Sequence, residues 1–197
     1  MDRAFVNALL ATPPRVLGRQ LLPLTLRHAG LLDVLQCPFL TGKPAGLSDL
    51  AVGVYVCSLP GAKALEQVRL GKVNPSELRA WVKRQGGALN HRAEAAAFRE
   101  YVETYFTGPE LFSSSKRSSG ESPAGVWGMV QALMHLQHMT MEEAWETPVC
   151  AALCLLAHAS EMVGGGEIVR DDEQDVEATL DRMNAALVAE AQKVTNG

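Results

Sequence analysis

Helix start signals recur along this chain, and they constrain its fold more than any other feature. Two stretches, "NPSE" at 74–77 and "TMEE" at 140–143, combine a capping side chain with a glutamate three residues later. In the first, Asn74 can cap a helix, Pro75 can occupy its first position, and Glu77 has the capping-box spacing. The first signal predicts the start of a full helix, and the second predicts a short turn of helix. The sequence therefore predicts an all-α fold.

The amino-acid composition agrees with this fold class. Hydrophobic residues make up 47% of the 197 residues and aromatic residues only 6%, which favours helices over a β-sandwich or barrel. The length allows one domain or two small ones. The start of the chain lacks the pattern of a signal peptide, and the longest apolar run, around 149–157, is far shorter than the roughly 20 residues that span a bilayer. We therefore expect a cytoplasmic protein that does not enter a membrane.

The sequence predicts about seven helices. In the first, Thr25 is the expected N-cap and Pro38 is expected to end the helix. The segment 46–61 is ambiguous, because Ser48 can cap a helix while the alternating valines of 52–56 would suit a strand; we favour the helix. Further helices are expected at 74–85, 90–106, 126–139, 140–145, 148–163 and 171–194.

Two of these helices carry signals for their start or their packing. The helix at 148–163 is expected to begin with Thr147 as its cap and Pro148 at its first position. The helix at 90–106 has an apolar stripe that is expected to face a core, formed by Phe98, Tyr101, Val102 and Tyr105.

The last predicted helix carries an apolar seam. Its members, spaced by four, three and four residues, are Val176, Leu180, Met183 and Leu187. Two heptads are long enough to pack on another helix but too short to require a coiled coil. The seam is expected to dock on its own domain or, alternatively, on a second copy or a partner.

A serine-rich stretch divides the chain. Residues 107–125 contain six serines, two prolines and three glycines and cannot form a packed element. We therefore expect an N-terminal helical bundle at 1–107, a linker loop at 108–125, and a helical hairpin with a terminal amphipathic helix at 126–197.

Charge is divided in a similar way. Residues 1–92 carry twelve Lys and Arg against five Asp and Glu, whereas residues 93–197 carry six against seventeen, so the net charges are +7 and −11. The two surfaces are expected to attract each other within one molecule, or alternatively to serve different partners or head-to-tail self-association.

Cysteine and histidine gather between His135 and His158. Cys150, Cys154 and His158 are spaced by four residues and His135 and His138 by three, so a tetrahedral zinc site is geometrically possible. However, the cysteines lie in an apolar run, where thiols behave as small hydrophobic groups, and their spacing matches no usual structural zinc signature. We expect these residues to pack with the cysteines reduced, and we expect no metal or other cofactor.

Other chemistries find little support in the sequence. Cys150 lies near a helix start, but the glutamates of 142–146 would raise the pKa of its thiol. The glycines of 164–166 precede an acidic helix start, which is the wrong charge for binding phosphate. Basic residues surround Trp81 within 79–92, yet glutamates are close by and no nucleic-acid-binding motif is present. We therefore expect a protein that is not an enzyme, with nucleic acid an unlikely partner.

Two stretches resemble proteins of tailed-bacteriophage morphogenesis. The first, at 16–58, reads "VLGRQLLPLTLRHAGLLDVLQCPFLTGKPAGLSDLAVGVYVCS" and resembles phage proteins with a "VLGRxLxPLTLxH" opening, a leucine helix and a "DL..AV.VCS" helix. The second, at 139–165, reads "MTMEEAWETPVCAALCLLAHASEMVGG" and is similar to the "T.EEAW..P...A" segment of tail assembly chaperones. Together they cover about a third of the chain, and their caps, prolines and apolar periodicity specify a fold more than a function.

The resemblance implies a non-enzymatic helical protein. Such chaperones bind the long helical tape-measure protein and are displaced as tail-tube subunits polymerise, so the resemblance implies these partners and carries over no catalytic residue. A binder of amphipathic helices needs an apolar groove, and the methionines Met129, Met134 and Met139 beside Trp127 are adaptable contact residues. The residues expected to contact a partner are Trp127, Met134, Val176, Leu180, Met183 and Leu187. The alternatives are a structural virion component of the tail or neck, a nucleic-acid-binding accessory protein and a zinc enzyme.

Overall fold

The structure is a computed structural model that describes residues 12–84, 90–107, 111–112, 125–162 and 167–168. It confirms the predicted all-α fold class, and the described residues form nine helices where about seven were expected. The helices are α2 (Leu26–Val34), α3 (Pro38–Thr41), α4 (Leu47–Cys57), α5 (Gly61–Arg69), α6 (Pro75–Arg84), α7 (His91–Phe106), α8 (Val126–Leu136), α9 (Met141–Glu146) and α10 (Val149–Met162). Short antiparallel pairs join β1 (Arg15–Val16) to β2 (Arg19–Gln20) and β3 (Leu111–Phe112) to β4 (Glu167–Ile168).

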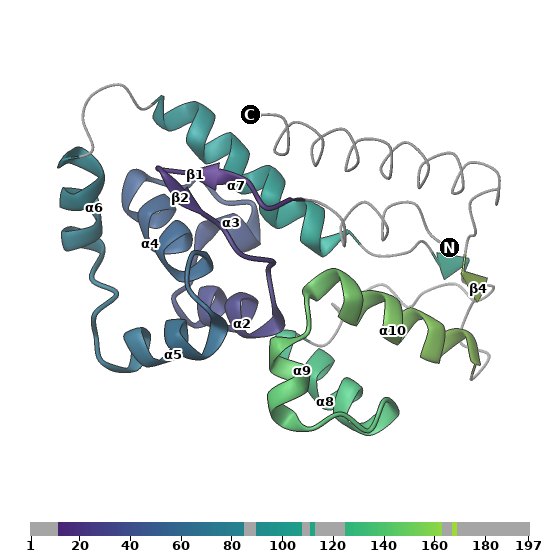
Figure 1. Ribbon diagram of the computed structural model, residues 1–197. Coiled ribbons are helices and arrows are strands. Elements are labelled where there is room, and N and C mark those ends of the chain that lie inside the picture. The colour runs from purple at the N-terminus through teal and green to yellow at the C-terminus, as the bar shows by residue number, and fades with distance from the viewer. Residues whose placement is uncertain (1–11, 85–89, 108–110, 113–124, 163–166, 169–197) are drawn as a thin grey trace, which may run out of the picture.

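Helix α2 lies at the centre of the packing. It contacts α4 and α5 on one side and α8, α9 and α10 on the other, as Figure 1 shows. Leu26, Ala29 and Leu32 of this helix are completely buried. The hydrophobic core combines side chains that precede and follow residues 108–125. Helix α2 thus connects helices from both of the helical segments predicted from the sequence.

Backbone hydrogen bonds hold the starts of α2 and α10 side by side. The Leu26 N–H donates to the Thr147 carbonyl at 2.9 Å, and the Val149 N–H donates to the Leu24 carbonyl at 2.9 Å. These two bonds form an isolated antiparallel bridge between the segments that precede the two helices. They also pair backbone groups that would otherwise lack partners at the helix starts.

Thr25 caps α2, as the sequence predicts. Its hydroxyl accepts a hydrogen bond from the His28 N–H at 3.4 Å, and its own N–H donates to His28 Nδ1 at 3.3 Å. Because Nδ1 accepts, the ring proton is on Nε2, which donates to the Leu59 carbonyl at 2.8 Å. The buried ring is therefore neutral, and burial lowers its pKa below the ordinary value.

Two helix boundaries differ from the prediction. Pro38 does not end the first helix, since α2 ends at Val34 and Pro38 is the first residue of α3, where its missing N–H costs nothing. The ambiguous segment forms α4, the helix that we favoured. Its N-cap is Gly46 rather than Ser48, and Asp49 Oδ2 accepts a hydrogen bond from the Gly46 N–H at 2.7 Å.

The valines that suggested a strand belong to a helix that is buried on most sides. Val52, Val54 and Val56 are all buried. An alternating apolar pattern therefore fits both a half-buried strand and a helix that is enclosed by other elements. At Gly53, an added Cβ would lie 2.7 Å from two ring carbons of Phe98. The absent side chain therefore allows the Phe98 ring of α7 to pack directly on the α4 backbone.

The apolar stripe of α7 is confirmed. Phe98, Tyr101, Val102 and Tyr105 are all buried, and α7 packs against α4 and α10. The Tyr101 hydroxyl donates to the Leu22 carbonyl at 2.7 Å, so this polar group is paired inside the core.

The predicted capping box of α9 is present, but Thr147 plays another role than expected. Thr140 and Glu143 exchange the two capping hydrogen bonds at 2.8 and 3.3 Å. The Thr147 hydroxyl donates to the Glu143 carbonyl at 2.8 Å, so this residue ends α9 and does not cap α10. Pro148 precedes α10, whose first residue is Val149.

Helices α3 and α5 are absent from the sequence prediction. Both lack a side chain that accepts a hydrogen bond at the N-cap, which is the start signal present at α2, α7 and α9. The predicted helix at 171–194, the glycines of 164–166 and most of the linker loop lie outside the described residues.

Candidate functional site

A groove with a volume of about 340 Å³ opens between α2, α5 and α9. Its floor is one face of α2, formed by residues with helical spacing: Arg27, Gly30, Leu31 and Val34. One wall consists of Leu65 and Arg69 of α5, and the other of Met141, Glu142 and Trp145 of α9. We call this surface the α2–α5–α9 groove.

Gly30 allows an indole ring to lie on the groove floor. A Cβ added at this position would lie 3.0 Å from Cζ3 of Trp145, closer than most such contacts. Trp127 of α8 stacks against Trp145, with ring centroids 5.7 Å apart. The two tryptophans therefore continue the apolar surface from the groove onto α8.

Several large apolar side chains are exposed at this surface. Val34 is 75% exposed, Met141 49% and Trp127 51%. A single exposed apolar residue is ordinary on any protein surface, but several around one concave groove are typical of a binding site. The groove is therefore the strongest candidate for a functional site in the described part of the chain.

A buried arginine of the groove floor forms ion pairs with α9. The side chain of Arg27 is 9% exposed; its Nε donates to Glu146 Oε1 at 2.7 Å, and its Nη2 lies 2.7 Å from Glu142 Oε1. Gly61 lies against this group, since an added Cβ there would be 2.9 Å from Glu146 Oε1. The two carboxylates balance a cation that would be costly to bury alone, and they hold α9 against α2.

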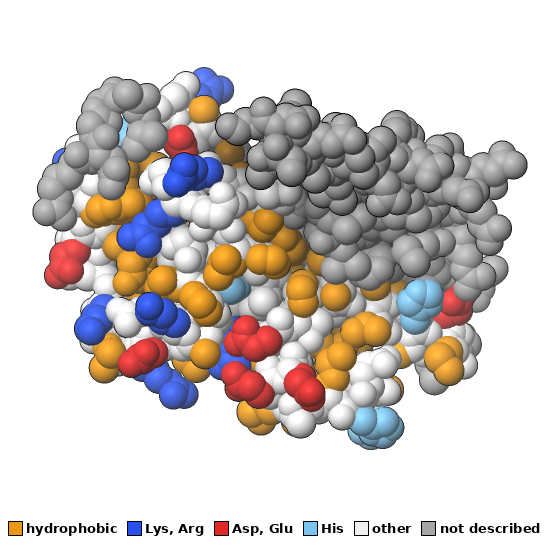
Figure 2. All heavy atoms as spheres, in the orientation of Figure 1, with side chains coloured by type: hydrophobic (Ala, Val, Ile, Leu, Met, Phe, Trp, Pro, Cys, Tyr) orange, Lys and Arg blue, Asp and Glu red, His pale blue; other side chains and the backbone are white. Residues whose placement is uncertain are grey.

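Opposite charges flank the groove. Figure 2 shows Lys and Arg side chains gathered over α5 and Asp and Glu side chains over α9. At the walls themselves, Arg69 of α5 is exposed, and the Glu142 side chain of α9 is 70% exposed. The division of charge between the two halves of the sequence therefore continues across the groove.

The structure places the predicted partner-contact residues in different environments. Trp127 lies beside the groove, whereas Met134 is half-buried and packs against the core. Met129 is buried and Met139 also packs against the core, so the methionines around α8 do not line a groove together. Four of the predicted contact residues lie outside the described residues: Val176, Leu180, Met183 and Leu187.

The cysteines and histidines that suggested a zinc site are divided between core and surface. Cys150 and Cys154 are buried, while His135, His138 and His158 are exposed. On α10, His158 Nδ1 lies 3.7 Å from Glu161 Oε2. Within the described ranges, no three His, Cys, Asp or Glu side chains are grouped so that they could hold a metal ion.

The buried thiols are poorly suited to nucleophilic chemistry. Burial raises the pKa of Cys150, and backbone hydrogen bonds oppose this only in part. The main cause is therefore burial rather than the neighbouring glutamates considered from the sequence. Burial also raises the pKa of Cys57, and the neighbouring Tyr101 opposes this only in part. A thiol that stays protonated is a weak nucleophile.

The basic patch around Trp81 contains a structural stack. The guanidinium carbon of Arg19 lies 4.7 Å from the Trp81 ring centroid and 5.1 Å from that of Tyr55. This arrangement joins β2, α4 and α6 through cation–π contacts. Stacking of bases needs a free aromatic face, and Arg19 occupies one face of Trp81.

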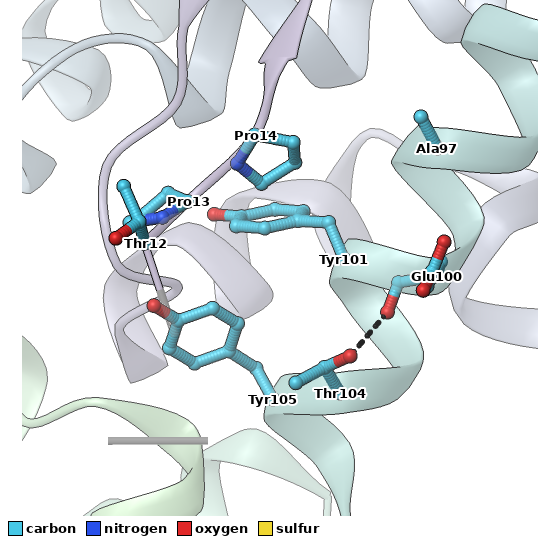
Figure 3. Close-up of a pocket in the computed structure, with 8 residues that line it drawn as sticks. All are labelled: Thr12, Pro13, Pro14, Ala97, Glu100, Tyr101, Thr104 and Tyr105. Atoms are coloured by element: carbon cyan, nitrogen blue, oxygen red, sulfur yellow. Dashed lines mark hydrogen bonds between the residues drawn. The ribbon is translucent and has the colours of Figure 1, made fainter. Parts of the chain in front are cut away.

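A second cavity, of about 240 Å³, lies between α7 and the segment that leads into β1 (Figure 3). Its lining includes Pro13, Pro14 and the rings of Tyr101 and Tyr105. Burial raises the pKa of Tyr105 to about 12. The cavity therefore offers flat proline and aromatic surfaces next to the exposed carboxylate of Glu100.

No protein-family model matches this chain, and neither do the curated proteins or the solved structures with which it was compared. Among the residues that the structure describes, none of the helices is long and apolar enough to cross a bilayer.

Most groove residues escaped the sequence analysis. Val34, Met141 and Trp145 come together only through the packing of α9 on α2. One local signal was available: Gly30 interrupts an otherwise good helical sequence, and an isolated glycine inside a helix often marks a close approach.

Proposed function

We propose that this chain is a non-enzymatic adaptor of the phage tail assembly chaperone type, which binds a helical partner of the tape-measure type during virion morphogenesis. The observation that carries this proposal is the exposed apolar lining of the α2–α5–α9 groove, above all Val34 and Met141. The sequence resemblance to tail assembly chaperones supports the identity of the partner.

The dimensions of the groove suit a short stretch of helix. Its floor runs from Arg27 to Val34, which corresponds to about 10 Å along a helix axis, or two turns. A partner helix would place apolar residues there with spacings of three and four, the usual pattern for a helix that binds in a groove. Each half-exposed apolar side chain that the partner covers would contribute on the order of 1 kcal/mol.

Co-purification tests the proposal. The chain is co-expressed with fragments of the longest helical protein encoded beside its own gene, and complexes are identified by size-exclusion chromatography. We expect a complex with the unaltered chain, and its loss in the double variant Val34→Asp/Met141→Asp. Val34 is 75% exposed and Met141 is 49% exposed, so the fold should tolerate both changes.

Met162→Asp provides the matched control. Met162 is 88% exposed on α10, which does not line the groove, so this variant should retain the complex. Retention of the complex by the groove variant would refute the proposal.

A structural component of the tail or neck is the second candidate from the sequence. The exposed groove is compatible with it as well, since a virion component also needs contact surfaces. A mass-spectrometric inventory of mature particles separates the two, because a chaperone should be absent from them and a structural component present.

A further inference from the structure

We infer that the α2–α5–α9 groove selects an amphipathic helix with mixed flanks, basic along the side of its apolar stripe that faces α9 and acidic along the side that faces α5. This inference rests on the proposed function and specifies the chemistry of the partner.

The α9 side of the groove is acidic despite the arginine within it. Arg27 is paired with both Glu142 and Glu146, so the three groups together carry one net negative charge at neutral pH. Arg27 is buried, whereas the side chains of Glu142 and Glu146 are 70% and 39% exposed. A partner therefore meets carboxylate oxygens on this side, and a lysine or arginine there would find an opposite charge.

The α5 side is basic. Arg69 lines this wall and is exposed, and none of the ion pairs found among the described residues involves it. Lys72 follows shortly after the end of α5 and is also exposed. An acidic residue on the partner would therefore be favoured on this side.

The width of a helix makes both contacts possible at once. A helix with its side chains is about 10–12 Å across, so its two flanks reach opposite walls while the apolar stripe faces Leu31 and Val34. At physiological ionic strength, charges interact over about 8 Å, so each flank responds mainly to its own wall. A helix with two basic or two acidic flanks would meet a like charge on one side.

Peptide binding to the full chain tests the inference. Three peptides share one apolar stripe. The first has one lysine flank and one glutamate flank, the second has two lysine flanks, and the third has two glutamate flanks. A staple on the face opposite the apolar stripe holds each peptide helical. Fluorescence anisotropy at low and high salt measures their affinities. We expect the mixed peptide to bind about fivefold more tightly than either uniform peptide, with the difference shrinking at high salt.

A charge reversal in the groove should change the preference. In Arg69→Glu both walls are acidic, so the lysine-flanked peptide should become the tightest ligand. Arg79→Glu makes the same change in net charge on α6, which does not line the groove, and should keep the preference for the mixed peptide.

The outcomes separate this inference from the proposed function. If all three peptides bind with equal affinity to the unaltered chain and to Arg69→Glu, the inferred charge preference is wrong. The proposed function, a groove that binds a helix, would still stand. If no peptide binds, the groove does not take such helices and both proposals fail. The same holds if sedimentation shows a dimer that Val34→Asp dissociates, because a second copy would then occupy the groove.

Discussion

Arg27 Nε donates to Glu146 Oε1 at 2.7 Å, across 119 positions of sequence. The two partners differ in burial, since the Arg27 side chain is 9% exposed and that of Glu146 is 39% exposed. The cation has therefore lost most of its hydration, while the carboxylate retains part of its own. This asymmetry determines what happens when either partner is removed.

Removal of the carboxylates should cost more stability than removal of the arginine. In Glu142→Gln/Glu146→Gln a buried cation lacks charged partners, and we expect the free energy of unfolding to fall by about 2 kcal/mol. In Arg27→Met the remaining carboxylates can hydrate, so the loss should be about 1 kcal/mol or less. Urea denaturation of both variants measures the difference. A larger loss in Arg27→Met would show that the arginine matters through packing rather than charge.

The contact between Gly53 and Phe98 predicts a strongly destabilising substitution. An alanine at position 53 would place its Cβ 2.7 Å from two carbons of the Phe98 ring, and both elements are held within the core. We expect Gly53→Ala to lower the free energy of unfolding by about 1–3 kcal/mol, although alanine favours helix more than glycine does.

Phe98→Leu supplies the control for this prediction. Alone it should destabilise by leaving a cavity, but in the Gly53→Ala background the smaller side chain should relieve the overlap. The double variant should therefore be less destabilised than the sum of the single variants. Simple additivity would show that the overlap is absorbed elsewhere.

The elements that the sequence predicts correctly are those with local signals. Thr25 and Thr140 begin helices because their hydroxyls accept from N–H groups within the same turn, and no distant residue is needed. Helix α5 has no such cap and forms against α2, so its signal is tertiary. The groove depends on distant contacts such as Trp145 on Gly30, and periodicity within one helix cannot reveal which helices will meet.

The buried ring of His28 predicts that stability falls in mild acid. Burial is the largest cause of its lowered pKa; Glu146 raises this pKa and Arg27 lowers it by smaller contributions. The unfolded chain, in which His28 has a pKa of about 6.5, therefore takes up a proton more readily than the folded chain. The stability contributed by the neutral ring is present above that pH and is lost as pH falls below it.

Denaturation at pH 7 and pH 5 measures this effect. We expect the free energy of unfolding to be lower at pH 5 in the unaltered chain. His28→Gln cannot titrate and can still accept or donate a hydrogen bond, so its loss between the two pH values should be smaller. Equal losses in both proteins would assign the pH dependence to other groups.

Gly30→Ala should alter the groove while leaving the fold intact. The new Cβ would lie 3.0 Å from Trp145 Cζ3, and the indole is half-buried and can shift by a few tenths of an ångström. The better helix propensity of alanine, about 1 kcal/mol, should offset most of the steric cost, so unfolding stability should change little. The stack between Trp145 and Trp127 should nevertheless change, because the indole moves away from α2.

Near-ultraviolet circular dichroism and tryptophan fluorescence report this movement. We expect both spectra to differ from those of the unaltered chain, and the affinity for a helical peptide to fall because the groove floor is raised. The comparison variant is Gly30→Ala/Trp145→Phe, in which the smaller ring leaves room for the added methyl group. Recovery of peptide binding in this double variant would locate the effect at the ring, whereas unchanged binding in Gly30→Ala would show that the partner does not reach the floor of the groove.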